Sequence, residues 1–142
     1  MSESFPDCRI CATAEDAVLV RTETSMAFYS PEPVAPSHLV VAVRAHRPLL
    51  TDLSAAEAFD LFGLVREVAI TASSAMIAEK FYLAAVGDVD KHFHIHLLPK
   101  QRDDAGLGPF IFGPAGWKSG LKTSSGPDPR VTEALRSLRR GP

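Results

Sequence analysis

The chain has 142 residues, of which 46% are apolar and 23% are charged, and its formal net charge at pH 7 is -2. This describes one soluble globular domain, because two typical domains do not fit and a chain of this length buries a sufficient core without disulfides. We expect no membrane span, since no run approaches about 18 consecutive apolar residues, and a cytoplasmic protein, since the first residues lack the basic and apolar regions of a secretory signal.

A C-x-x-C motif, Cys8 to Cys11, lies near the N-terminus. A structural disulfide is not expected without a secretion signal, and thioredoxin-type redox chemistry needs the motif between a strand and a helix of a βαβ unit. The motif is therefore either half of a zinc site or a pair of thiols with no special role. The choice depends on whether two further ligands lie nearby.

The middle of the chain predicts strands around one long helix. Runs of β-branched and aromatic residues predict four strands, at residues 17–21, 26–29, 38–43 and 81–86. Ser54 and Glu57 form an S-x-x-E capping box, and apolar residues then recur at helical spacing for about six turns. The order of two strands, one strand, a long helix and two strands predicts an α+β fold.

The most informative segment is residues 92–98, which predict an alternating strand closed by Pro99. Alternation would place His92, His94 and His96 on one face, about 6.6 Å apart, with the apolar residues facing the core. At that spacing the histidines must divide their roles. We expect His94 to be the nucleophile or base, its other ring nitrogen donating to a backbone carbonyl, while His96 protonates a leaving group.

Two other interpretations of the histidine row remain open at this point. A strand with H-x-H spacing can supply two ligands of a catalytic zinc with an open water position, which predicts a metal-dependent hydrolase. Alternatively, the histidines form a polar, solvent-facing strand surface. Activity in the presence of chelators would distinguish the nucleophile from the catalytic zinc.

The run His92 to Leu98 resembles the H-φ-H-φ-H-φ-φ motif of the histidine triad (HIT) family of nucleotide hydrolases and transferases, where φ is apolar. Residues 27–41 are similar to a proline-rich segment of that family, and Arg44-Ala45-His46 resembles its K-x-H. The resemblance covers residues 8–100. It implies an antiparallel five-stranded sheet with one long helix, a homodimer, and a nucleotidyl-histidine intermediate on a small-molecule nucleotide.

The resemblance also implies roles for individual residues. His94 is the expected nucleophile, His96 lies beside the leaving group and His92 supports them. Zinc-containing relatives hold a structural zinc through four positions that match Cys8, Cys11, His46 and His92, a chemically suitable Cys₂His₂ set. We further expect Ser30, Phe28 and His38 to line the substrate site, with His38 also bonding backbone near the triad.

Several positions depart from the family pattern. Ser30 stands where nucleotide-binding relatives have a ribose-binding Asp, and Ala85 replaces an Asn. Residues 87–91 shorten a Gly-Gln-Ser stretch that cradles the phosphate, and Lys91 there is the candidate to restore some positive charge. Four acidic residues are either solvated or bind Mg²⁺ with a polyphosphate substrate: Asp88, Asp90, Asp103 and Asp104.

The C-terminal part of the chain differs in charge from the rest. Residues 1–115 contain 9 Lys and Arg against 15 Asp and Glu, whereas residues 116–142 contain 6 against 2. Six charges without interleaved aromatic residues are a weak nucleic-acid footprint, so we expect no nucleic-acid partner. We divide the chain into a HIT-like domain, residues 1–115, and an extension, residues 116–142, with a short basic helix. Residues 108–113 and Trp117 form either a lid over the site, or a small buried apolar cluster or dimer contact.

Overall fold

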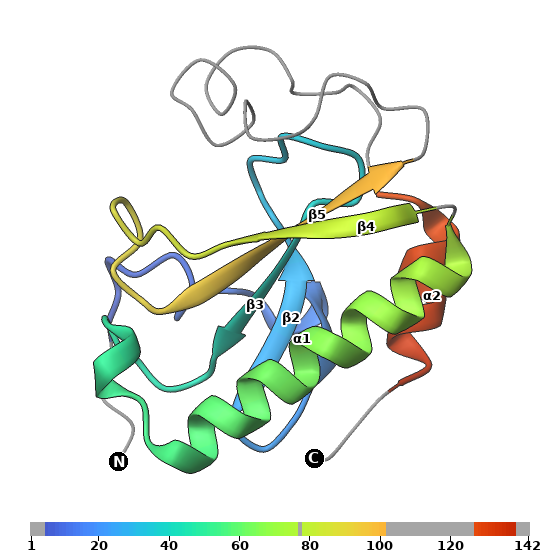
Figure 1. The fold of residues 1–142 in the computed structure, drawn as a ribbon. Coiled ribbons are helices and arrows are strands. Elements are labelled where there is room, and N and C mark those ends of the chain that lie inside the picture. The colour runs from blue at the N-terminus through green and yellow to red at the C-terminus, as the bar shows by residue number, and fades with distance from the viewer. Residues whose placement is uncertain (1–4, 77, 102–126, 139–142) are drawn as a thin grey trace.

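The computed structural model describes residues 5–76, 78–101 and 127–138 (Figure 1). Its strands and helices follow one another as β1 (Val18–Arg21), β2 (Ser25–Tyr29), β3 (Leu39–Val43), α1 (Ala55–Ala75), β4 (Ala78–Ala84), β5 (His94–Gln101) and α2 (Pro129–Arg136). Short 3-10 turns lie at Glu15–Ala17 and Leu50–Asp52. The predicted α+β fold and the predicted element order are confirmed.

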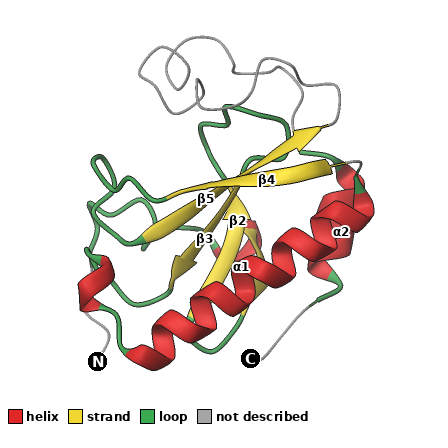
Figure 2. Cartoon of the chain, viewed as in Figure 1, coloured by secondary structure: helices red, strands yellow, loops and turns green. Residues whose placement is uncertain are grey.

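The strands form one five-stranded sheet in the order β1-β2-β3-β5-β4, and every neighbouring pair is antiparallel. Helix α1 connects β3 to β4 and runs diagonally across one face of the sheet, with α2 beside its C-terminal end (Figures 1 and 2). Ser54 caps α1: its side chain accepts from the Glu57 N–H, and the Glu57 carboxylate reaches back to the Ser54 N–H. The capping box is therefore confirmed.

The two faces of the sheet have different surroundings. The face covered by the helices carries the main core, to which Ala27, Val41, Ile95 and Leu97 contribute from the strands. The opposite face carries a smaller cluster, in which Phe28, Val40 and Ala42 pack with Ile10 of the N-terminal segment. His96 pairs with Val40 and His94 with Ala42 across β3 and β5. The histidines therefore lie on the face away from the helices.

The predicted bounds of the last two strands were wrong. Helix α1 has about the six turns predicted and ends at Ala75, because the backbone is already extended at Met76, so β4 runs over Ala78–Ala84 rather than residues 81–86. Strand β5 begins at His94, two residues later than predicted. It also continues through Pro99, which lies beyond the last residue paired with β3, so β5 has a neighbour on one side there and a missing N–H is tolerated.

Helix α2 packs into the main core although it follows the long segment 102–126, which lies outside the described residues. Its Val131 and Leu135 are fully buried. The Tyr29 hydroxyl lies 2.7 Å from that of Thr132, and Arg136 donates to the carbonyl of Asp16 at 2.9 Å. The predicted terminal helix thus exists. The division of the chain at residue 115 stays a prediction.

In the part of the chain that the structure describes, no helix combines the length and the apolarity that crossing a membrane requires.

Candidate functional site

His94 begins strand β5 and is 5% exposed. Its Nδ1 lies 2.6 Å from the backbone carbonyl oxygen of His92, so Nδ1 carries the proton and donates it to that oxygen. The Nε2 atom therefore keeps its lone pair. This is the arrangement predicted for a nucleophilic histidine, because the carbonyl fixes the ring and stabilises positive charge that develops when Nε2 attacks.

His96 lies next to His94 on the same face, with the ring centroids 4.8 Å apart. The two rings meet edge to face, with an interplanar angle of 75°. Burial, and next the neighbouring His94, lower the pKa of His96 to about 4, so the ring is neutral at pH 7.

His38 fixes the proton position on His96. The Val34 N–H donates to His38 Nδ1 at 3.2 Å, which places the His38 proton on Nε2, and that atom lies 2.9 Å from His96 Nδ1. His96 Nδ1 is thus the acceptor, and the proton of His96 is on Nε2. Burial and then His96 lower the pKa of His38 to about 3, which keeps this hydrogen-bond chain neutral. His38 contacts backbone near the triad, as predicted, and reaches the triad itself.

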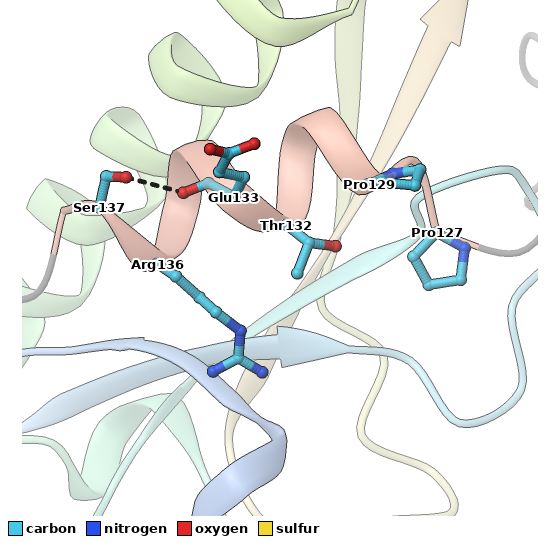
Figure 3. A pocket seen from close by; sticks show the side chains of 6 residues that line it. All are labelled: Pro127, Pro129, Thr132, Glu133, Arg136 and Ser137. Carbon is cyan, nitrogen blue, oxygen red and sulfur yellow. Dashed lines mark hydrogen bonds between the residues drawn. The ribbon is translucent and has the colours of Figure 1, made fainter.

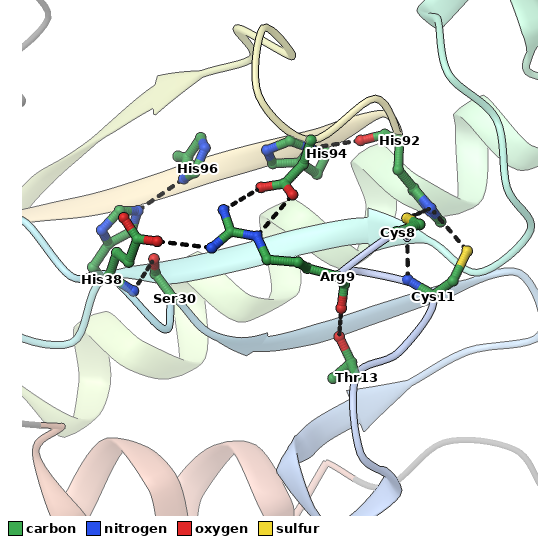
Figure 4. Close-up of polar contacts among 11 residues, drawn as sticks. Cys8, Arg9, Cys11, Thr13, Ser30, His38, His92, His94 and His96 are labelled. Atoms are coloured by element: carbon green, nitrogen blue, oxygen red, sulfur yellow. Dashed lines mark hydrogen bonds and ion pairs between the residues drawn. The ribbon is translucent and has the colours of Figure 1, made fainter. Parts of the chain in front are cut away.

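His92 departs from the predicted row. It precedes β5 rather than belonging to it, and its ring is completely buried on the side of the two cysteines (Figure 4). Its Nε2 donates to the carbonyl oxygen of Val43 at 2.6 Å, and its Nδ1 lies 3.4 Å from Sγ of both Cys8 and Cys11. The prediction that His92 shares a strand face with His94 and His96 was wrong, because strand geometry begins only at His94.

The two cysteines, His46 and His92 bring four ligand atoms within 4.8 Å of one another. His46 Nδ1 lies 3.4 Å from Cys11 Sγ. In a tetrahedral zinc site with ordinary bond lengths, sulfur and nitrogen ligands are about 3.5 Å apart, so these distances fit a closed Cys₂His₂ site. The Val43 carbonyl bonds the nitrogen of His92 that faces away from the cysteines, as an outer partner of a metal ligand does.

Sequence reasoning missed an ion-pair cluster in front of the histidines. Arg9, between the two cysteines, donates to both carboxylate oxygens of Asp90 at 2.9 and 2.8 Å and to Glu32 at 2.7 Å. Figure 4 shows Arg9 reaching from the cysteine loop across the face that carries His94, His96 and His38. A basic residue inside the C-x-x-C was the available signal. Nothing in the sequence indicated its two partners.

The predicted substrate-binding residues lie around this cluster in different environments. Ser30 is half-buried, and its hydroxyl accepts from the Glu32 N–H at 3.2 Å. Phe28 is 6% exposed within the small apolar cluster. Ala85 and Lys91 are exposed at the two ends of the connection between β4 and β5. Their roles toward substrate stay predictions.

Some predicted features lie elsewhere or outside the described residues. Asp90 binds Arg9, and Asp88 is exposed. Asp103, Asp104, residues 108–113 and Trp117 are outside the described part of the chain. An open hollow beside α2 contains none of the histidines (Figure 3); it is lined by Pro127, Pro129, Thr132, Glu133, Arg136 and Ser137.

Comparison with known proteins gives one family. A family model described as HIT domain matches residues 12–103. The chain is 32% identical over 92 residues to bis(5'-nucleosyl)-tetraphosphatase [asymmetrical] of Schizosaccharomyces pombe, a match covering 61% of this chain and 50% of that protein. It is also 32% identical over 92 residues to the bifunctional bis(5'-adenosyl)-triphosphatase/adenylylsulfatase FHIT of Arabidopsis thaliana, covering 61% and 51%. The chain spans about half the length of these relatives.

Solved structures share the fold at low sequence identity. A Zn-bound histidine triad family protein from Mycobacterium smegmatis is 17% identical and superposes with a TM-score of 0.67 over 92% of this chain and 91% of that one. A diadenosine triphosphate hydrolase from Plasmodium falciparum is 19% identical, with a TM-score of 0.65 over 89% and 78%. The five-stranded sheet with its long helix is therefore an arrangement that these proteins have in common.

Proposed function

Because this chain belongs to the HIT family, we propose that it hydrolyses a nucleotide phosphoanhydride through a nucleotidyl-histidine intermediate on His94. The observation that carries the proposal is the bond between His94 Nδ1 and the His92 carbonyl, which leaves Nε2 free to attack. The names of the related tetraphosphatase and triphosphatase agree with this class of substrate.

In the first step, the Nε2 lone pair of His94 forms a bond to the α-phosphorus while the bond between phosphorus and the leaving oxygen breaks. The positive charge that develops on the ring is stabilised by the Nδ1–H bond to the His92 carbonyl. In the second step, water attacks phosphorus, the P–N bond breaks, and its electron pair returns to Nε2. The water proton leaves with the phosphate product or to solvent.

The protonation of His96 favours a phosphoanhydride over a phosphoramidate. A ring with a pKa of about 4 is a hydrogen-bond donor through Nε2–H at pH 7 and a poor source of a full proton. A nucleotide phosphate leaves as a stable anion, since its second pKa is about 6. An amine leaving group needs a proton, so we expect phosphoramidates to be cleaved more slowly.

We further propose a structural zinc on Cys8, Cys11, His46 and His92. This metal would tie the N-terminal segment to the residue that supplies the carbonyl partner of His94. The four gathered ligands favour this closed site over a catalytic zinc held by His94 and His96. Mg²⁺ with a polyphosphate substrate, the homodimer and the cytoplasmic location stay predictions.

The test compares wild type with His94→Ala on diadenosine triphosphate and on adenosine phosphoramidate. We expect the wild type to release AMP from both, faster from the triphosphate, and the variant to release none while keeping its melting temperature. Brief treatment with a chelator should not stop turnover of still-folded protein. AMP release by His94→Ala equal to that of wild type would exclude the covalent route.

Differences from the family pattern favour a second candidate, a nucleotide-binding protein with little or no turnover. Two family positions that contact nucleotide are changed, to Ser30 and Ala85, and an acidic residue, Asp90, stands in the shortened phosphate loop. Binding of AMP by the wild type without release of AMP from either substrate would support this candidate.

A further inference from the structure

We infer that Arg9 is the phosphate-binding residue of this site. Glu32 accepts from one N–H group of the Arg9 guanidinium until a nucleotide phosphate replaces it. The inference rests on the proposed function, because it assigns a recognition residue to the same nucleotide site. It also assigns a phosphate-binding group where the phosphate loop of the family is altered, because Arg9 of the cysteine segment binds Asp90 of that loop.

The backbone around Arg9 is held in place on both sides. Cys8 and Cys11 close a turn in which the Cys11 N–H donates to Cys8 Sγ at 3.3 Å and the Ala12 N–H to the Cys8 carbonyl at 3.0 Å. Ile10 is 5% exposed and packs in the apolar cluster under the histidine face. Ile10 thus anchors the segment in the protein, and the long side chain of Arg9 extends over the site.

Asp90 ties the guanidinium to the segment that leads into the triad, because it lies two residues before His92 and binds Arg9 at 2.9 and 2.8 Å. Because Asp90 takes two parallel N–H groups of Arg9, it fixes the plane and direction of the guanidinium. Arg9 is thereby held across the histidine face with its side chain 51% exposed, which leaves it accessible to a ligand (Figure 4).

The two carboxylates hold Arg9 unequally. The Asp90 side chain is 20% exposed and makes two bonds, whereas the Glu32 side chain is 67% exposed and makes one. The pair of Arg9 with Glu32 is a surface ion pair of small net strength. Among the described residues, three of the five N–H groups of Arg9 have a partner, so the guanidinium can hold Asp90 and still present donors to a phosphate.

Charge explains why Glu32 should exchange. One guanidinium between two carboxylates carries a net charge of -1, which opposes the approach of a phosphate. When a phosphate oxygen replaces Glu32, the guanidinium still lies between two anions. The Glu32 carboxylate moves into water and no longer repels the phosphate. Asp90 stays because its two bonds are parallel and better shielded.

The test measures binding of AMP and of adenosine by titration calorimetry, with zinc content and melting temperature recorded for each variant. Glu32→Gln should bind AMP about two- to five-fold tighter than wild type, since it removes the competitor. Arg9→Gln should bind AMP about 10- to 100-fold more weakly, because a charge-assisted hydrogen bond is lost. Adenosine affinity should not change in either variant.

Two further variants make the result specific. In Arg9→Gln with Asp90→Asn, binding of AMP should stay weak; recovery would show that Arg9 only neutralises Asp90, and would overturn the inference. The control is Arg21→Gln, which removes the ion pair of Arg21, on β1, with Glu15, in the 3-10 turn before it, and should leave AMP affinity unchanged. An Arg9→Lys variant that keeps its zinc should bind AMP between wild type and Arg9→Gln, because Lys keeps the charge without the fork.

The outcomes separate this inference from the proposed function. If wild type hydrolyses diadenosine triphosphate and binds AMP while Arg9→Gln binds AMP equally well, the inference alone is wrong. Unchanged or weaker AMP binding by Glu32→Gln would likewise exclude the exchange. If wild type binds neither AMP nor diadenosine triphosphate, the proposed function fails and the inference fails with it.

Discussion

Acid should destabilise the folded protein through His38, and the variant His38→Gln should remove that sensitivity. His38 is 1% exposed, and burial followed by the charges of His96 and His94 lowers its pKa to about 3 from an ordinary value of 6.5. Between about pH 3 and pH 6.5 the unfolded chain binds a proton at His38 and the folded chain does not. Lowering the pH through this window therefore favours the unfolded state.

The expected loss of stability follows from the difference between the pKa values of His38 in the unfolded and folded chains. Above pH 6.5 neither state is protonated at His38, so the residue contributes no pH dependence there. Below pH 6.5 the free energy of unfolding falls by about 1.4 kcal/mol per pH unit, which amounts to about 3 kcal/mol near pH 4.5. His96, with a pKa of about 4, adds a loss of the same sign.

Urea unfolding followed by circular dichroism at several pH values from 7 to about 4.5 measures the effect. In His38→Gln the amide N–H group replaces His38 Nε2–H as the donor to His96, so the variant keeps this bond without the titrating ring. Acid also protonates metal ligands, but that loss is common to both proteins and cancels in the difference. Parallel curves for wild type and His38→Gln would refute the reasoning.

Three other predictions concern stability and metal binding. Leu135→Ala should lower the free energy of unfolding by about 2 to 5 kcal/mol in urea, because it opens a cavity under α2, and a loss below about 1 kcal/mol would contradict the burial of that helix. Cys11→Ser should reduce the zinc content of the purified protein and its melting temperature, whereas an unchanged metal content would exclude Cys11 as a ligand. Asp60→Ala should cost about 1 to 3 kcal/mol and speed amide exchange in the β1–β2 hairpin, because Asp60 accepts from Thr22 and Thr24; unchanged exchange would show that the hairpin does not depend on it.

Local patterns in the sequence determined the elements of the fold and the nature of its chemistry. The capping box at Ser54 and Glu57 and the apolar stripe after it depend on contacts within one or two turns, so they could be predicted without tertiary information. The alternation after His94 placed Ile95 and Leu97 in the core for the same reason. The resemblance to HIT proteins supplied the family, which the match over residues 12–103 confirmed.

Contacts between distant segments were decided only by the tertiary structure. His92 lies 84 residues from Cys8 and leaves the histidine row to face it. Strand periodicity could not indicate this contact; the family resemblance alone implied that Cys8, Cys11, His46 and His92 come together, as they do. Arg9 meets Asp90 across 81 residues, and α2 joins the core through Leu135. The sequence around a residue determines on which face of its helix or strand the side chain lies. Which charge or ligand it meets there depends on how the whole chain closes, because such pairings are set by packing between elements rather than by spacing within one.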